Sequence, residues 1–113
     1  MHLYQSLELE HKNLKKIIFF ENKKYSFYLE EFDAIVLEKN ETFQNPDEAF
    51  FIELFFVMKK ILVYLKEKSI DCKLFFDKGP TTFKITLSLK TEHNHEDLLT
   101  DMQNMFEVNN DPF

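Results

Sequence analysis

A chain of 113 residues has room for one domain, and at this length a single hydrophobic core is enough for folding without disulfides or metals. The net charge is −6 and all fourteen basic residues are lysine, so the chain has no planar arginine fork for phosphate or guanine. Both features speak against a nucleic-acid partner, because such binding depends mainly on cationic contacts with the phosphate backbone. The single cysteine, Cys72, excludes an internal disulfide and indicates a reduced, cytoplasmic protein.

Two further classes are excluded by the pattern of the chain. The first residues lack the basic start and apolar run of a secretory signal. The most apolar segment, residues 49–65, is interrupted by Glu53, Lys59 and Lys60, whereas a bilayer requires about 20 apolar residues. We therefore expect no membrane association.

The amino-terminal part predicts strands after an ambiguous start. Leu3, Leu7 and Leu14 are spaced as in a helix, although residues 7–10 alternate as in a strand, and we expect a short helix before Leu14. Strands are predicted over residues 17–20, 25–30 and 33–38, because these segments are rich in β-branched and aromatic residues and the second one alternates.

The segment Asn45-Pro46-Asp47-Glu48 predicts the start of a long helix. Asn45 is a good capping residue, Pro46 suits the first helical position, and acidic residues favour the positive end of the helix dipole. Glu48 follows Asn45 at the spacing of a capping box. We expect the helix to run from this cap to about Lys68.

Two more strands and a final helix complete the prediction. Residues 71–77 and 82–89 alternate on either side of a turn that contains Gly79 and Pro80, and residues 94–106 have helical apolar spacing. Residues 107–113 are too polar to continue the helix and are expected to fray. The fold class is therefore α+β, with an antiparallel sheet of about five strands in the order (α)βββ-α-ββ-α, packed on one long central helix.

The segment Thr91-Glu92-His93-Asn94-His95-Glu96-Asp97 looks most like a chemical site. His93, His95 and the nearby carboxylates could serve a metal-dependent or acid-base enzyme. Such an enzyme is the alternative to the protein-binding function that we expect. However, Asn94 precedes Asp97 by three residues at the start of an apolar helical pattern, which is typical of a helix cap. We expect Asn94 to cap the last helix, and His93 and His95 not to converge.

Other enzyme signals are weak. Cys72 lies on the apolar phase of its strand with Leu74 and Phe76, which indicates an inert core thiol. With Gly79 as the single glycine, no phosphate-binding loop, dinucleotide fingerprint or nucleophile elbow is possible. We therefore expect no enzyme activity, no catalytic residue, no cofactor and no small-molecule substrate.

The long helix has more apolar residues than one sheet requires. One broad arc, which includes Phe51, Leu54 and Ile61, suits packing on a sheet. Two further rows are predicted to form a dimer or partner-binding interface: Ile52, Phe56 and Val63 in one, and Phe50, Val57 and Tyr64 in the other. Either the other helices cover these rows, or a second copy or another protein does.

In its order of elements, its small size and its acidic charge, the chain is similar to the class I chaperones of type III secretion systems. The resemblance implies that the middle helix pairs two subunits and that the sheets hold an unfolded stretch of another protein. We therefore expect a non-enzymatic protein-binding domain that forms a homodimer and acts as a chaperone, an antitoxin, an immunity-type inhibitor or a regulator by masking a partner protein.

Overall fold

The computed structural model describes residues 16–30 and 33–109, the last three of them by their backbone alone. The elements in chain order are three strands, β1 (Lys16–Glu21), β2 (Tyr25–Glu30) and β3 (Ala34–Lys39), then the helix α2 (Glu48–Glu67), the strands β4 (Cys72–Lys78) and β5 (Phe83–Leu89), and the helix α3 (His95–Asn109). The helix expected before Leu14 lies outside the described residues.

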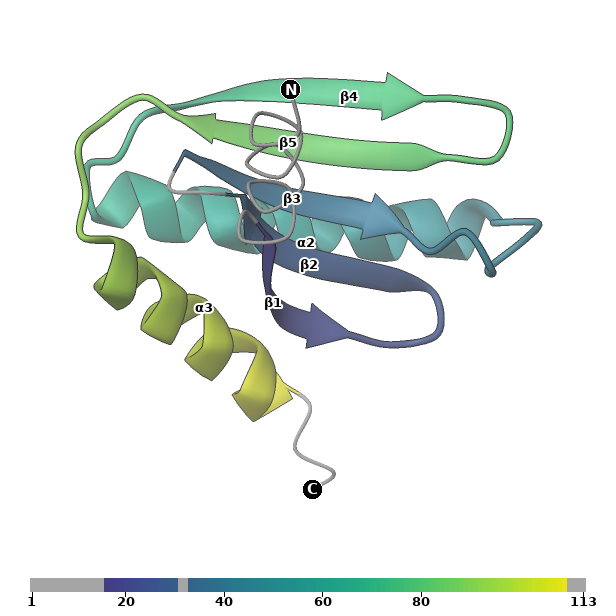
Figure 1. The fold of residues 1–113 in the computed structure, drawn as a ribbon, viewed down its shortest axis with the longest axis horizontal. Helices are drawn as coiled ribbons and strands as arrows, with labels where there is room; N and C mark the ends of the chain where they lie inside the picture. Colours follow the sequence, from purple (N-terminus) through teal and green to yellow (C-terminus); the bar gives the residue numbers. More distant parts are fainter. Residues whose placement is uncertain (1–15, 31–32, 110–113) are drawn as a thin grey trace, which may run out of the picture.

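The five strands form one sheet in the order β1-β2-β3-β5-β4, and every neighbouring pair is antiparallel. Figure 1 shows α2 running along one face of this sheet and α3 at an angle near β1, with which it is in contact. The predicted fold class is confirmed, including the long central helix packed on the sheet.

Alternation along the strands places the core between the sheet and α2. Every second side chain of the central strands belongs to this core, as the period of two in a strand requires. The buried side chains of α2 pack against them at helical spacing. The largest fully buried members of this core are Phe27, Leu29, Ile35, Leu37, Phe50, Leu54, Ile61, Leu65, Ile85, Leu87, Leu98 and Met102. On β2 and β3, the intervening residues Tyr28, Ala34 and Val36 form a second, smaller buried cluster.

The amino-terminal cap of α2 differs from the prediction. Asp47, not Asn45, is the capping residue, because its side chain accepts a hydrogen bond from the backbone N–H of Phe50 at 3.0 Å and the helix begins at Glu48. Asn45 has a φ of 60°, in the left-handed region that asparagine tolerates better than most residues. The chain thus turns at Asn45 before the helix starts, which removes the expected capping box.

The carboxy-terminal end of α2 is closed by two backbone hydrogen bonds. The N–H of Ser69 donates to the carbonyl of Lys66 at 3.0 Å, and the N–H of Ile70 donates to the carbonyl of Leu65 at 2.8 Å. This pair of bonds defines a Schellman motif, in which the residue after the cap adopts a left-handed conformation. Ser69 occupies that position with a φ of 59°.

The cap of α3 agrees with the prediction. The side chain of Asn94 accepts a hydrogen bond from the backbone N–H of Asp97 at 2.9 Å, and Glu96 and Asp97 lie in the first turn. The helix continues to Asn109, so the first three residues of the segment that was expected to fray are helical. Phe106 of α3 is buried against the rings of Phe19 and Phe27 in the sheet.

No helix in the described part of the chain is long and apolar enough to cross a membrane.

Candidate functional site

The side of α2 that faces away from the sheet carries exposed apolar side chains. At 100° per residue, this side is opposite the buried residues Leu54 and Ile61. Ile52, Phe56 and Val63 lie there and are 63%, 65% and 51% exposed. We call these three residues the outer stripe. Large exposed apolar side chains that share one face mark a candidate site for contact with another protein.

The second predicted row of α2 is not part of this surface. Phe50 is buried and contacts the rings of Phe43 and Tyr25. Val57 and Tyr64 are half-buried and pack against the core, and the Tyr64 hydroxyl donates a hydrogen bond to a carboxylate oxygen of Asp101 in α3. Phe50 is therefore excluded from a surface interface, whereas Val57 and Tyr64 keep part of their surface exposed, and their place in an interface stays a prediction.

The edge strand β4 adds exposed apolar side chains, two of which, Leu74 and Phe76, lie on the phase that alternation assigns to the core. Leu74, Phe75 and Phe76 are between 38% and 52% exposed, and we call them the edge strip. Leu74 and Phe76 are on the same face of the sheet as α2, because they pair with Leu87 and Ile85 of the core. They stay exposed because β4 lies at the edge of the sheet, next to the part that α2 covers.

One contact joins the edge strip to α2. The ring of Phe55 lies 6.1 Å from the ring of Phe76, between centroids, and Phe55 is itself 40% exposed. The sequence does hold a signal for this surface: Phe75 stands on the polar phase of β4, between Lys73 and Asp77, so both faces of the strand carry an aromatic side chain.

Cys72 is half-buried at the start of β4 rather than enclosed in the core. Its expected neighbours Leu74 and Phe76 are exposed, whereas Cys72 itself packs against the core as a partly buried residue. Burial, and then the negative charge of Asp71, raises the pKa of the thiol. A raised pKa keeps the thiol protonated, which is unfavourable for a nucleophile.

The two histidines of the predicted chemical segment lie near each other but do not complete a metal site. Both line a hollow together with Asp33 and Lys90. Burial, and then the charge of His93, lowers the pKa of His95. The Nδ1 of His93 lies 2.9 Å from the carbonyl oxygen of Thr91. Within residues 16–30 and 33–109, no three His, Cys, Asp or Glu side chains converge to hold a metal ion.

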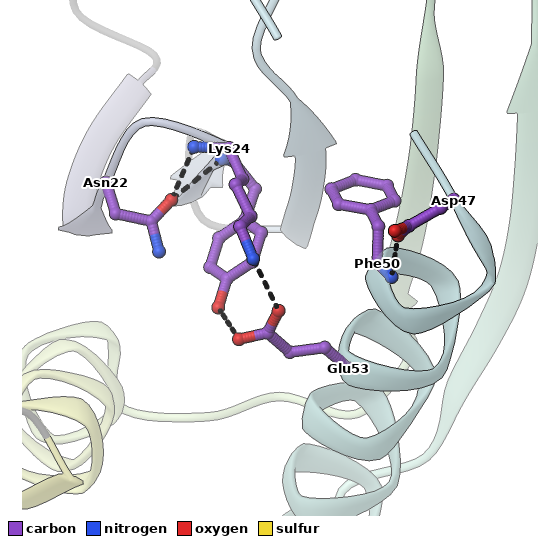
Figure 2. Close-up of polar contacts among 6 residues, drawn as sticks. Asn22, Lys24, Asp47, Phe50 and Glu53 are labelled. Atoms are coloured by element: carbon purple, nitrogen blue, oxygen red, sulfur yellow. Dashed lines mark hydrogen bonds and ion pairs between the residues drawn. The ribbon is translucent and has the colours of Figure 1, made fainter. Parts of the chain in front are cut away.

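A polar contact links the β1–β2 turn to α2 on the flank opposite β4. The hydroxyl of Tyr25 donates a hydrogen bond to Oε2 of Glu53 at 2.8 Å, and Nζ of Lys24 lies 3.7 Å from Oε1 of the same carboxylate (Figure 2). Asn22 supports the turn, because its side-chain oxygen accepts hydrogen bonds from the backbone N–H groups of Lys24 and Tyr25. These contacts cover this flank of α2 only in part, because the side chains of Lys24 and Glu53 remain 49% and 45% exposed.

A second hollow, of about 340 Å³, lies between the β3–α2 connection and the β4–β5 turn. Lys39 lines it and is buried, and its Nζ donates to the carbonyl oxygens of Asn40 and Phe43 at 2.9 Å and 2.7 Å. These bonds pair the charged nitrogen with backbone acceptors, as buried polar groups require. Lys39 thereby holds the connection that leads to the cap of α2.

Comparison with known proteins found no matching family model, no matching curated protein and no matching solved structure.

Proposed function

We propose that this chain is a small acidic, non-enzymatic protein-binding domain that forms a homodimer and masks a partner protein. Its mechanism is steric and electrostatic cover, as in a chaperone, an antitoxin, an immunity-type inhibitor or a regulator. The observation that carries the proposal is the exposed apolar surface of α2 and β4, made of the outer stripe and the edge strip.

The exposure of these side chains supports binding to protein. Ile52 and Phe56 expose about two thirds of their surface, and contact with another protein would remove it from water. Removal of apolar surface from water is the main favourable contribution in most protein association. Within the described residues, the packing of α2 on the sheet does not account for these two side chains, because they face away from the sheet.

Charge supports the choice of partner. The net charge is −6, and three of the carboxylates that contribute to it, Glu96, Asp97 and Asp101, lie within two turns of α3. A surface with this excess attracts a partner segment that carries lysine or arginine, and the effect weakens as salt is added. We therefore propose a basic or extended protein segment as the masked partner, with no nucleic acid and no membrane, and the cytoplasm as the site of action.

The absence of enzyme activity is part of the proposal. His93 and His95 lie beside the capped start of α3, and the half-buried Cys72 has a raised pKa. Neither site gathers a nucleophile, a base and an orienting group in the described residues. Binding, rather than catalysis, is the function that the surface supports.

The test combines the mass of the free protein with capture of its partner. We expect light scattering to give a dimer and immobilised protein to retain a host protein. We expect Phe56→Glu to lose the captured protein, while the control Gln103→Glu, at an exposed position on α3, keeps it. A monomer at all concentrations, or equal capture by Phe56→Glu and the control, would contradict the proposal.

A further inference from the structure

Among the described strands, β4 is paired on one side only, so the backbone groups of its other side have no partner strand. It pairs with β5 over its whole length, from Cys72 opposite Leu89 to Lys78 opposite Phe83. In the described part of the chain, no strand lies on its other side. A seven-residue edge strand with exposed apolar side chains is a template for pairing with another strand unless something covers it.

The backbone hydrogen bonds show which residues of β4 point outward. At one end the N–H of Gly79 donates to the carbonyl of Thr82, and at the other the N–H of Lys90 donates to the carbonyl of Asp71. Both bonds are made by odd-numbered residues on the β4 side, Gly79 and Asp71. Hydrogen-bonded pairs occur at every second position of an antiparallel ladder, so the odd-numbered residues of β4 direct their backbone groups toward β5. The outward N–H and C=O groups therefore belong to Cys72, Leu74, Phe76 and Lys78.

We propose that β4 pairs antiparallel with β4 of a second copy of this chain, with the two-fold axis at Phe75. This inference rests on the proposed homodimer and names its contact. In this register the outward groups of Leu74 meet those of the second copy's Phe76, and each copy supplies the same bonds to the other. The two five-stranded sheets become one continuous sheet.

The side chains of β4 select this register. With the axis at Phe75, Lys73 lies opposite Asp77 of the second copy, and this opposite-charge pair occurs twice. Leu74 lies opposite Phe76, and Phe75 lies opposite itself. Opposite charges and apolar pairs directly across antiparallel strands are the favourable combinations.

The neighbouring two-fold registers lack this match. With the axis at Leu74, Lys73 would lie opposite Phe75 of the second copy and lose its charge partner. With the axis at Phe76, Phe75 would lie opposite Asp77, and Leu74 opposite Lys78. Only the register centred on Phe75 pairs every apolar residue of the edge strip with an apolar residue.

The contact also covers exposed surface on the helix side of the sheet. Leu74 and Phe76 of both copies would form one apolar cluster, next to the Phe55 side chain that already contacts Phe76 in each copy. The outer stripe faces away from the sheet, so this pairing leaves it open for the masked partner. The dimer contact and the partner contact are then separate surfaces.

Cysteine cross-linking tests the register. In a Cys72→Ser background, we expect Phe75→Cys to form a covalent dimer under mild oxidation, because residue 75 lies opposite itself. The controls are Lys73→Cys and Asp77→Cys, each made alone in the same background. In each control dimer the two thiols are four residues apart, about 13 Å along a strand, which is too far for a disulfide. We therefore expect both controls to run as monomers on a gel without reducing agent. Cross-linking of a control as fast as of Phe75→Cys would overturn the register.

Charge exchange provides a second test. Lys73→Asp creates two like-charge contacts per dimer, and we expect the dimer dissociation constant to rise about tenfold or more. Adding Asp77→Lys restores both pairs in exchanged order and should restore the dissociation constant. An exchange variant that stays as weak as Lys73→Asp would contradict the pairing.

Hydrogen exchange on the unmodified chain separates this inference from the proposed function. We expect the N–H groups of Leu74 and Phe76 to become protected as concentration rises through the dimer transition, while those of Phe75 and Asp77 are protected throughout. A dimer in which Leu74 and Phe76 exchange as fast as in the monomer overturns the β4 contact and leaves the homodimer standing. A chain that stays monomeric overturns both.

Discussion

The hydroxyl of Tyr25 in β2 donates a hydrogen bond to the carboxylate of Glu53 in α2, across 2.8 Å. The ring of Tyr25 is stacked on that of Phe27, 4.6 Å away between centroids, and the residue is only 4% exposed. One side chain thus joins the aromatic core to the exposed flank of α2. The bond adds a polar contact to the packing of the buried residues Leu54 and Ile61, which face the sheet and leave the outer stripe on the opposite side of α2.

Alkaline pH is expected to destabilise the fold through this contact. Burial, and then the hydrogen bond to Glu53, raises the pKa of Tyr25 to about 12, from an ordinary value of 10.0. Between these values the folded chain holds a proton that the unfolded chain releases, so the stability is full below pH 10 and falls as pH rises toward 12. Tyr28 and Tyr64 act in the same direction, because burial and their carboxylate partners also raise their pKa values.

The variant Tyr25→Phe isolates this contribution. We expect the free energy of unfolding, measured by urea at pH 8 and at pH 11, to fall less with pH in Tyr25→Phe than in the unmodified chain. An equal fall in both proteins would show that the proton of Tyr25 contributes nothing to the pH dependence.

The cap of α2 is tested by two neighbouring substitutions. Asp47→Ala removes the acceptor for the N–H of Phe50 and should lower the free energy of unfolding by about 1 kcal/mol. Asn45→Gly keeps a residue suited to the positive φ and should change stability little. A larger loss for Asn45→Gly than for Asp47→Ala in urea denaturation would restore the cap expected from the sequence.

The end of α2 offers a stabilising substitution. Ser69 has a φ of 59°, which costs energy for a residue with a Cβ atom and none for glycine. We expect Ser69→Gly to raise the free energy of unfolding by about 0.5 to 1 kcal/mol, because glycine is the preferred residue in this motif. Ser69→Ala serves as the control and should give no gain, and a gain equal to that of glycine would argue against the left-handed conformation.

The two faces of α2 are distinguished by a matched pair of truncations. Leu54 is fully buried, so Leu54→Ala should lower the free energy of unfolding by about 2 to 5 kcal/mol. Ile52, two residues earlier, is 63% exposed, and Ile52→Ala should cost less than about 0.5 kcal/mol. The measurement is denaturation at a concentration where the chain is monomeric. Similar losses in the two variants would mean that the rotation of α2 on the sheet is wrong.

Local patterns in the sequence are sufficient to predict most of this fold. The alternation in β5, from Phe83 to Leu89, and the cap at Asn94 depend on residues close together in the chain, so they could be read directly. The sequence places the cap of α2 two residues too early, because Asn45, Pro46 and Asp47 all favour a helix start. The left-handed backbone conformation of Asn45 excludes a helix start at that residue and leaves Asp47 as the cap.

The surface was harder to predict than the core. The periodicity of α2 separates Ile52, Phe56 and Val63 from the sheet-facing residues, and these three are indeed exposed. It cannot show that Phe50 is buried and Tyr64 half-buried, because that depends on contacts with Phe43 and with Asp101 of α3, which lie outside the helix. The exposure of β4 follows from its place at the edge of the sheet, a property of the strand order and not of the strand's own residues.

The most direct test of the account is the molar mass of the unmodified chain in solution, measured by light scattering on size-exclusion chromatography over a range of concentrations. We predict a species of twice the chain mass of 13.7 kDa that dissociates on dilution. A mass of one chain at every concentration would contradict the homodimer and leave the apolar surface of α2 and β4 without the proposed second copy.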